Sequence, residues 1–168
     1  IGYELALSGK KFVSMNAIKM IPASSLIDVC DWIKNNTHAK AAFFHPVLFR
    51  PFRACTKRQG FIEEKLDGNI AIVDRRFANI YYSRFADIHR GLTYLDFPEK
   101  HVAALDLYPK MQERYLSLDG AYIEFLKEKY PGYRYFLTEK GHKLPYLLIF
   151  KNSHFLLYDL TQELTKTK

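Results

Sequence analysis

A lysine followed two residues later by an Asp-Gly pair is the part of the sequence whose residue types could perform chemistry. An apolar run over 61–66, predicted as a strand, carries Lys65, and a turn is predicted at Asp67 and Gly68. A lysine whose pKa is lowered by burial or by nearby cations can act as a nucleophile. Gly68 would let the backbone turn tightly beside a ligand. The segment therefore predicts a nucleophilic lysine at a ligand-binding turn, and the structural alternative is a surface lysine on an edge strand.

The same segment allows a second kind of chemistry. Glu63 and Lys65 match the end of the Asp…Glu-x-Lys pattern of metal-dependent nucleases, in which carboxylates hold Mg²⁺ and the lysine orients water. That pattern needs an aspartate upstream. Residues 32–62 contain no Asp or Glu, and Asp28 and Asp31 fall on a predicted helix. The sequence therefore favours the lysine nucleophile over a nuclease metal site.

The Lys-x-Asp-Gly segment resembles the nucleophile motif of the covalent nucleotidyltransferases, which comprise the DNA ligases, RNA ligases and mRNA capping enzymes. Two later segments resemble motifs that follow in this family: 80–84 ends in Ser-Arg, and 155–160 carries an aromatic-Asp pair. The segments 46–48 and 116–120 resemble the regions that precede the nucleophile and the family's Asp-Gly-Glu motif. The resemblance covers residues 46–160 with the motifs in the family's order.

The resemblance implies a ligase-like core in which Lys65 attacks the α-phosphate of ATP, or of GTP or NAD, to form a lysyl-nucleotide intermediate. It also implies Mg²⁺ as the ion that neutralises the triphosphate, and DNA or RNA as the substrate. The nucleotide-binding residues that it implies are Asp67 at the sugar or beside the lysine, Gly68 at the turn, Arg84 at phosphate, Tyr158 stacked on the base, and Glu124 as a carboxylate.

The chain departs from the family pattern at several positions. Ala121 stands where the Asp-Gly-Glu motif has its glutamate, so Glu124 can replace that group only with a different local backbone. Asn69 and Ile70 stand where many DNA ligases have an arginine. The later Glu-Gly and Lys-x-Lys motifs, which bind metal and the α-phosphate, do not follow before Lys168. The sequence therefore predicts an incomplete or degenerate enzyme.

Positive charge predicts an anionic partner. The chain has 25 Lys and Arg against 18 Asp and Glu, a net charge of +7, and the segment 32–62 combines cations with phenylalanines. Such a segment suits nucleic-acid phosphates and unstacked bases, although a solvated basic face over a buried core would look the same. The alternative function is a non-catalytic basic α+β module that binds nucleic acid or a protein. The predicted nucleic-acid contacts are Lys40, Arg50, Arg53, Lys57 and Arg58.

The elements expected to position these residues form a single α+β domain with a mainly antiparallel sheet and a few helices. A capped amphipathic helix is predicted from Ser24 to Asn36. Extended or loop structure is predicted over 43–60, leading to a strand. The β-branched runs at 70–73 and 80–82 predict a β-hairpin around residues 74–76.

The C-terminal half is predicted to be rich in strands. A helix that Pro98 begins is expected over 99–107 and to end at Pro109. Residues 120–130 fit a helix or a strand equally well. Strands are predicted at 133–137, 146–150 and 155–158, with a turn at 151–154 between the last two.

Composition predicts a cytoplasmic protein without a membrane partner. No window of about 18 consecutive apolar residues occurs, and the start lacks the layout of a signal peptide. Cys30 and Cys55 are too few for a disulfide scaffold or a zinc cluster, so both thiols are expected to be reduced. The histidines show no metal-ligand spacing. Residues 1–14 are expected to be an upstream segment or tag remnant, and 15–168 the domain.

Overall fold

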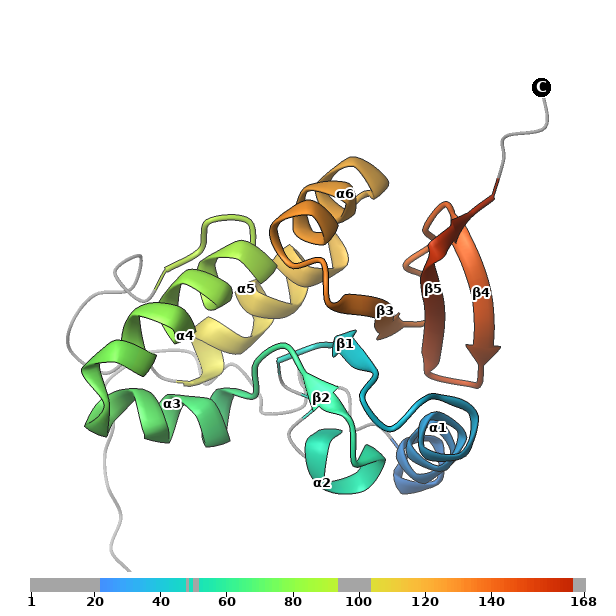
Figure 1. Cartoon of the computed structure of the whole chain (residues 1–168), viewed down its shortest axis with the longest axis horizontal. Coiled ribbons are helices and arrows are strands. Elements are labelled where there is room, and N and C mark those ends of the chain that lie inside the picture. The colour runs from blue at the N-terminus through green and yellow to red at the C-terminus, as the bar shows by residue number, and fades with distance from the viewer. Residues whose placement is uncertain (1–21, 48, 50–51, 94–103, 165–168) are drawn as a thin grey trace, which may run out of the picture.

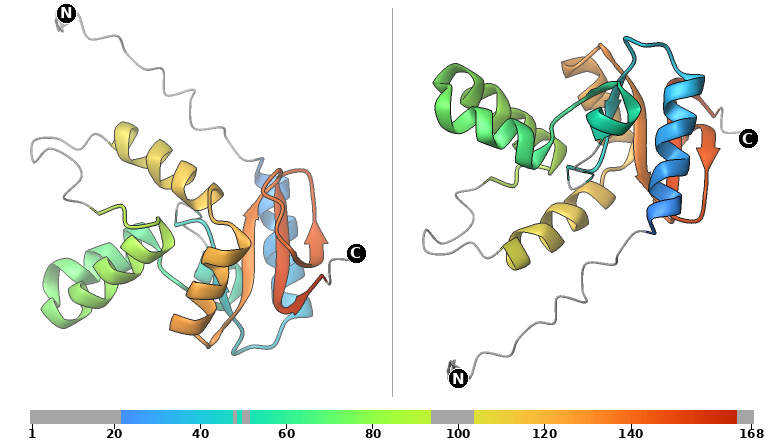
Figure 2. Two further views of the ribbon diagram at one scale, coloured as in Figure 1. Left: turned by 90° about the horizontal axis from the view of Figure 1, so that it is seen from above. Right: turned by 90° about the horizontal axis from the view of Figure 1, so that it is seen from below.

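A five-stranded mixed sheet lies between two groups of helices in the computed structural model, which describes residues 22–47, 49, 52–93 and 104–164 (Figures 1 and 2). The strand order is β2-β1-β3-β5-β4, in which β1 runs parallel to β2 and β3 while β5 is antiparallel to β3 and β4. The strands are β1 (Ala42–Phe44), β2 (Gln59–Gly60), β3 (Tyr133–Glu139), β4 (Tyr146–Lys151) and β5 (Phe155–Glu163). The helices are α1 (Ala23–Asn36), α2 (Phe52–Thr56), α3 (Glu64–Val73), α4 (Arg75–Ile88), α5 (Ala104–Leu116) and α6 (Gly120–Lys129). The predicted α+β class is confirmed.

Alternate strand residues face two separate hydrophobic cores, because successive side chains of a strand point to opposite faces. On β1, Phe43 faces the core beneath α1 and α2, whereas Phe44 faces the core beneath α4, α5 and α6. On β5, Leu157 and Tyr158 divide in the same way. The three predicted C-terminal strands are confirmed, and their largely continuous apolar runs suit a sheet that is covered on both faces.

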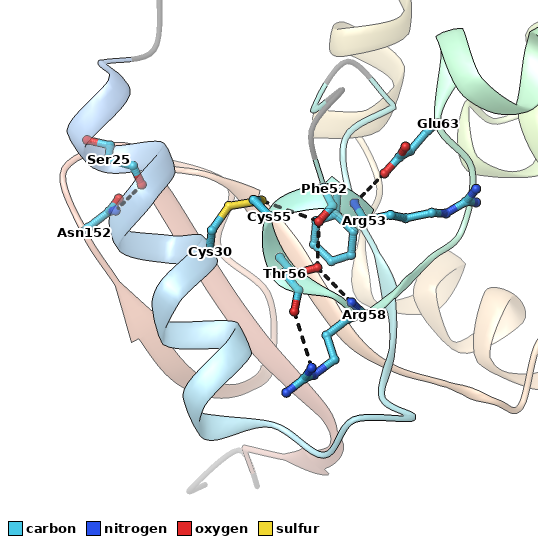
Figure 3. Close-up of a disulfide and its surroundings, with 9 residues drawn as sticks. All are labelled: Ser25, Cys30, Phe52, Arg53, Cys55, Thr56, Arg58, Glu63 and Asn152. Carbon is cyan, nitrogen blue, oxygen red and sulfur yellow. Dashed lines mark hydrogen bonds between the residues drawn. A yellow bond between two sulfur atoms is a disulfide. The ribbon is translucent and has the colours of Figure 1, made fainter.

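A disulfide between Cys30 and Cys55 joins α1 to α2 (Figure 3). The Cα atoms lie 5.6 Å apart although 25 positions separate the residues in sequence. The expectation of two reduced thiols is therefore wrong, because the fold places α2 directly against α1. The bond fixes α2 to the helix that covers one face of the sheet.

The predicted β-hairpin at 70–82 is wrong, because these residues form the antiparallel helices α3 and α4. Tyr81, Phe85 and Ile88 have helical spacing and are buried in the larger core, and this burial outweighs the β-propensity of the isoleucines and valine. The chain does reverse direction within the predicted 74–76 segment, but only at Asp74, because Arg75 and Arg76 already belong to α4. Asp74 caps α4, its Oδ1 accepting hydrogen bonds from the backbone N–H groups of Arg76 (2.9 Å) and Phe77 (3.1 Å).

Four other local predictions have different outcomes. The helix α1 is confirmed, although Pro22 precedes it and no side chain caps it. The predicted stop at Pro109 is wrong: α5 runs through this exposed proline because Met111 and Tyr115 anchor it in the core. The predicted start at Pro98 lies outside the described residues. The ambiguous segment 120–130 is the helix α6, which Asp119 caps.

Two buried histidines make the stability of this fold sensitive to mild acid. Burial lowers the pKa of His45 and of His89 to about 4, against 6.5 in an unfolded chain. The unfolded chain therefore binds these protons first as the pH falls from 6.5 toward 4, and folding loses stability throughout that window. We expect a loss on the order of 4 kcal/mol at pH 5 relative to pH 7.5, measured by urea unfolding. His45→Gln and His89→Gln should each flatten this dependence, and an unchanged slope in both would contradict it.

Candidate interaction surface

The helices α3 and α4 form a helical hairpin whose tip, at Asp74, extends away from the sheet (Figure 2). A single residue connects them, since Asp74 ends α3 by donating its N–H to the Ile70 carbonyl (2.9 Å) and also caps α4. The base of the hairpin contacts α2, Phe61 just after β2, and Tyr133 at the start of β3. Two groups of polar contacts hold this base in place.

The first contact is a bidentate ion pair between Arg53 on α2 and Asp67 on α3. Nη1 and Nη2 of Arg53 donate to the two carboxylate oxygens at 2.6 and 2.7 Å, and Nη2 also donates to the Gly60 carbonyl at 3.1 Å. Asp67 is buried, with 3% exposed, so its charge requires such a partner. Burial lowers the pKa of Arg53, but the hydrogen bond and charge of Asp67 more than reverse this and raise it overall. The pair therefore connects α2 to the first turns of α3.

Glu63 completes this network at the start of α3. Its backbone N–H donates to Asp67 Oδ2 (2.8 Å), so the Asp67 side chain satisfies a donor at the start of the helix, although the Glu63 side chain makes no capping bond. Its own Oε1 accepts from the backbone N–H of Arg53 at 2.6 Å, as Figure 3 shows. Burial raises the pKa of Glu63, against the lowering effect of Arg53. The sequence pattern Glu-x-x-x-Asp thus builds a helix start that is joined to α2.

The second contact holds α4 through Arg84 and Asp87. Arg84 donates to the Phe61 carbonyl (3.2 Å), and its guanidinium carbon lies 5.2 Å from the Phe61 ring centre and 5.8 Å from that of Tyr130. Asp87 accepts a hydrogen bond from the Tyr130 hydroxyl (2.5 Å) and pairs with Lys129 (2.7 Å). Burial and then this bond to Asp87 raise the pKa of Tyr130 to about 12. These contacts fix α4 to the end of α6.

The outer surface of the hairpin is apolar and basic. The exposed fractions reach 80% for Ile72 and 83% for Val73, which are apolar residues that folded proteins more often bury. Arg75 and Arg76 follow directly at the tip, and neither side chain forms an ion pair within the described part of the chain. We call this the hairpin surface, and its apolar members are Ile70, Ile72, Val73, Ile80 and Tyr82.

The structure separates the residues predicted to bind a nucleotide. Lys65 lies in the first turn of α3 rather than on a strand, and nothing is described of its side chain. Asp67 and Arg84 both lie at the base of the hairpin, where they hold protein groups. Gly68 is a helical residue near the Tyr81 hydroxyl, so the predicted turn at 67–68 is wrong. The helical spacing of Leu66, Ile70 and Val73 would have been the signal.

The other two predicted nucleotide contacts lie elsewhere. Tyr158 is 4% exposed, and its hydroxyl donates to the His142 carbonyl within the core, so its ring is not presented to a base. Two strands, β1 and β3, separate its strand from β2. Glu124 lies on α6, where it binds the Tyr146 hydroxyl and pairs with Lys127 at 2.7 Å. Asp119 and Gly120 are the cap and first residue of a helix, so their match to the Asp-Gly-Glu motif is a capping signal.

The predicted nucleic-acid contacts do not form one continuous patch among the described residues. Arg53 is committed to Asp67, and Arg58 donates to the Lys34 carbonyl (2.6 Å) and Thr37 carbonyl (2.7 Å) at the C-terminus of α1. Both arginines therefore neutralise groups of the protein itself. Arg50 lies outside the described residues. Lys40 and Lys57 are exposed.

None of the family models, curated proteins or solved structures compared with the chain matches it. Across the ranges that the structure describes, no three His, Cys, Asp or Glu side chains gather closely enough to hold a metal ion. No helix in these ranges combines the length and apolar character needed to cross a membrane.

Removing the charge of Asp67 should loosen the hairpin. We expect Asp67→Asn to lower the free energy of unfolding by about 3 kcal/mol, because it leaves a half-buried guanidinium without its carboxylate. In this variant, hydrogen exchange of the α3 and α4 backbone amides should accelerate relative to the original chain, and by more than exchange of the α1 amides does. Glu128→Gln, the same change at an exposed position of α6, should alter stability by less than about 0.5 kcal/mol. Equal effects of the two variants would contradict the assigned role of the ion pair.

Proposed function

We propose that this chain is a non-catalytic binding module that docks a protein partner on the hairpin surface. The observation that carries the proposal is the exposure of five large apolar residues within residues 70–82 of the two projecting helices. Single exposed apolar residues are ordinary, but Ile72 and Val73 stand together at the tip with more than three quarters of their surface exposed, and exposed apolar surface of this kind favours an interaction site. Burying a side chain such as Ile72 or Val73 contributes about 1.5–3 kcal/mol, so a few contacts suffice for specific binding.

The partner should present an apolar patch bordered by carboxylates. Arg75 and Arg76 stand beside Val73 without an ion-pair partner among the described residues, so acidic groups on the partner would complement them. The net charge of +7 opposes association of two copies of the chain and steers acidic partners toward it. The rigid base of the hairpin, held by Arg53, Asp67 and Arg84, presents this surface without a large ordering cost.

A displayed library of short peptides tests the docking proposal. Peptides selected on the chain should combine aliphatic or aromatic residues with Asp or Glu, and Ile72→Asn with Val73→Asn should weaken their binding at least about tenfold. Arg75→Glu with Arg76→Glu should also weaken it and reduce its salt dependence.

The matched control is Leu164→Asn, which replaces an apolar residue that is 55% exposed outside the hairpin and should leave peptide binding unchanged. Peptides that bind the double asparagine variant as well as the original chain would overturn the proposal. A labelled single-stranded oligonucleotide serves as the second probe. Oligonucleotide binding that depends on Arg75 and Arg76, in the absence of peptide selection, would replace the protein partner with a nucleic acid.

Lysyl-nucleotide formation at Lys65 stays a prediction from the family resemblance, as do ATP and Mg²⁺. The engagement of Asp67 with Arg53 and the burial of Tyr158 favour binding over catalysis. The intact mass after incubation with Mg²⁺ and ATP, GTP or NAD is the direct measurement for this chemistry.

We further propose that the chain works in an oxidising compartment, in place of the predicted cytoplasm. The Cys30–Cys55 disulfide supports this, because such bonds persist in oxidising compartments and are rare where glutathione and thioredoxin act. A thiol-reactive maleimide should label the protein from its native source only after reduction. Labelling without a reductant would contradict the proposal.

A further inference from the structure

A pocket distinct from the hairpin surface lies between the end of α4 and the middle of α5. Its volume is about 330 Å³, within the size range of small-molecule sites. Three of its lining residues come from the turn after α4, and three come from one face of α5, where positions 110, 113 and 114 share helical spacing. The lining residues are Arg90, Gly91, Leu92, Lys110, Glu113 and Arg114.

The turn after α4 contains two consecutive residues with positive φ angles. Arg90 and Gly91 have φ angles of 52° and 82°, and the N–H of Gly91 donates to the Ala86 carbonyl at 2.7 Å. Glycine adopts this left-handed region freely, but an arginine is held there at a cost in free energy. Together with the bond from the Arg90 N–H to the Asp87 carbonyl (3.4 Å), the Gly91 bond forms a Schellman-type helix end, in which a left-handed residue is common. No heavy atom lies within 4 Å of where a Cβ of Gly91 would be, so the turn borders open space.

Neighbouring groups hold the Arg90 side chain in place. Nη2 pairs with Asp119 at 2.7 Å, and the guanidinium carbon lies 4.9 Å from the centre of the Tyr122 ring. The Tyr122 N–H and the Arg90 side chain hold the pKa of Asp119 below its usual range, so this carboxylate stays ionised beside the arginine. The Nε–H of Arg90 is buried without an acceptor in the part of the chain that the structure describes. Because protein atoms occlude this Nε, a ligand in the pocket would meet Arg90 at the rest of its side chain, which is 30% exposed.

The charge of the pocket is positive. Arg90, Lys110 and Arg114 supply three cations; Glu113 is the one carboxylate among the lining residues, and Asp119 beside them pairs with Arg90. Arg114 has no ion-pair partner among the described residues, so its planar guanidinium is available to a ligand. Forked guanidinium donors bind phosphate and carboxylate through paired hydrogen bonds.

We propose that this pocket binds the phosphate group of a small phosphate monoester. Arg114 donates to the phosphate oxygens, Arg90 lies against them through its guanidinium edge, and Lys110 adds a third positive charge. A dianionic terminal phosphate gains more from three cations than a singly charged diester or carboxylate does. The volume leaves room for the organic part of the ester beside Leu92.

Titration of the whole chain with methyl phosphate at physiological salt, followed by amide NMR, tests the assignment. Saturable shifts should appear at Arg90, Gly91 and Arg114 with millimolar or tighter affinity, and dimethyl phosphate and acetate should bind more weakly. Arg114→Gln should weaken binding at least about tenfold. Glu113→Gln should strengthen it about threefold, because it removes the opposing charge. A variant that fails to fold cannot produce that gain.

The control is Lys151→Gln, an exposed cation at the end of β4, which should leave phosphate binding unchanged. Equal weakening by Lys151→Gln and Arg114→Gln would show attraction to net charge alone and overturn the site. Absence of saturation at about 10 mM methyl phosphate would also overturn it. Acetate that binds as tightly as methyl phosphate would overturn the assignment to a phosphate monoester.

Discussion

The ion pair between Arg53 and Asp67 joins parts of the chain that no strand or helix connects. Arg53 lies on α2, which the Cys30–Cys55 bond fixes to α1, and Asp67 lies in the first turns of α3. A carboxylate that is 3% exposed is stable as an anion only with its partner in place. The disulfide and the smaller core hold α2 in place. The position of α3, and therefore of the whole hairpin, depends on that position of α2.

The helix α4 connects the two surfaces for which we propose binding. Its first residues, Arg75 and Arg76, belong to the tip of the hairpin, and the turn after its last residue carries Arg90 into the pocket. Between them, Tyr81, Phe85 and Ile88 bury the inner face in the larger core. Because this packing holds the middle of the helix, its two ends can present arginine side chains at the surface.

The positive charge of the chain divides into two groups with different roles. One group consists of arginines whose charge is balanced by groups of the protein itself. Its members contact a carboxylate, helix carbonyls and aromatic rings, respectively: Arg53, Arg58 and Arg84. Arg75 and Arg76 at the hairpin tip form no ion pair among the described residues, whereas Arg90 lines the pocket and also pairs with Asp119. Net charge alone could not distinguish the groups, because the distinction depends on which acceptors the fold brings within hydrogen-bond distance.

Local pattern determined part of this structure, and long-range packing decided the rest. The amphipathic helix α1, the strands β3, β4 and β5, the chain reversal at Asp74 and the turn at 151–154 followed from the pattern of neighbouring residues, because local backbone preference and short apolar runs act over a few positions. The helical state of 70–82, the cysteine pairing and the roles of Asp67, Arg84 and Tyr158 did not. Each depends on a partner at least 14 positions away or on burial in a core that several elements share, as in the Arg53–Asp67 pair, and only the tertiary structure places those groups together.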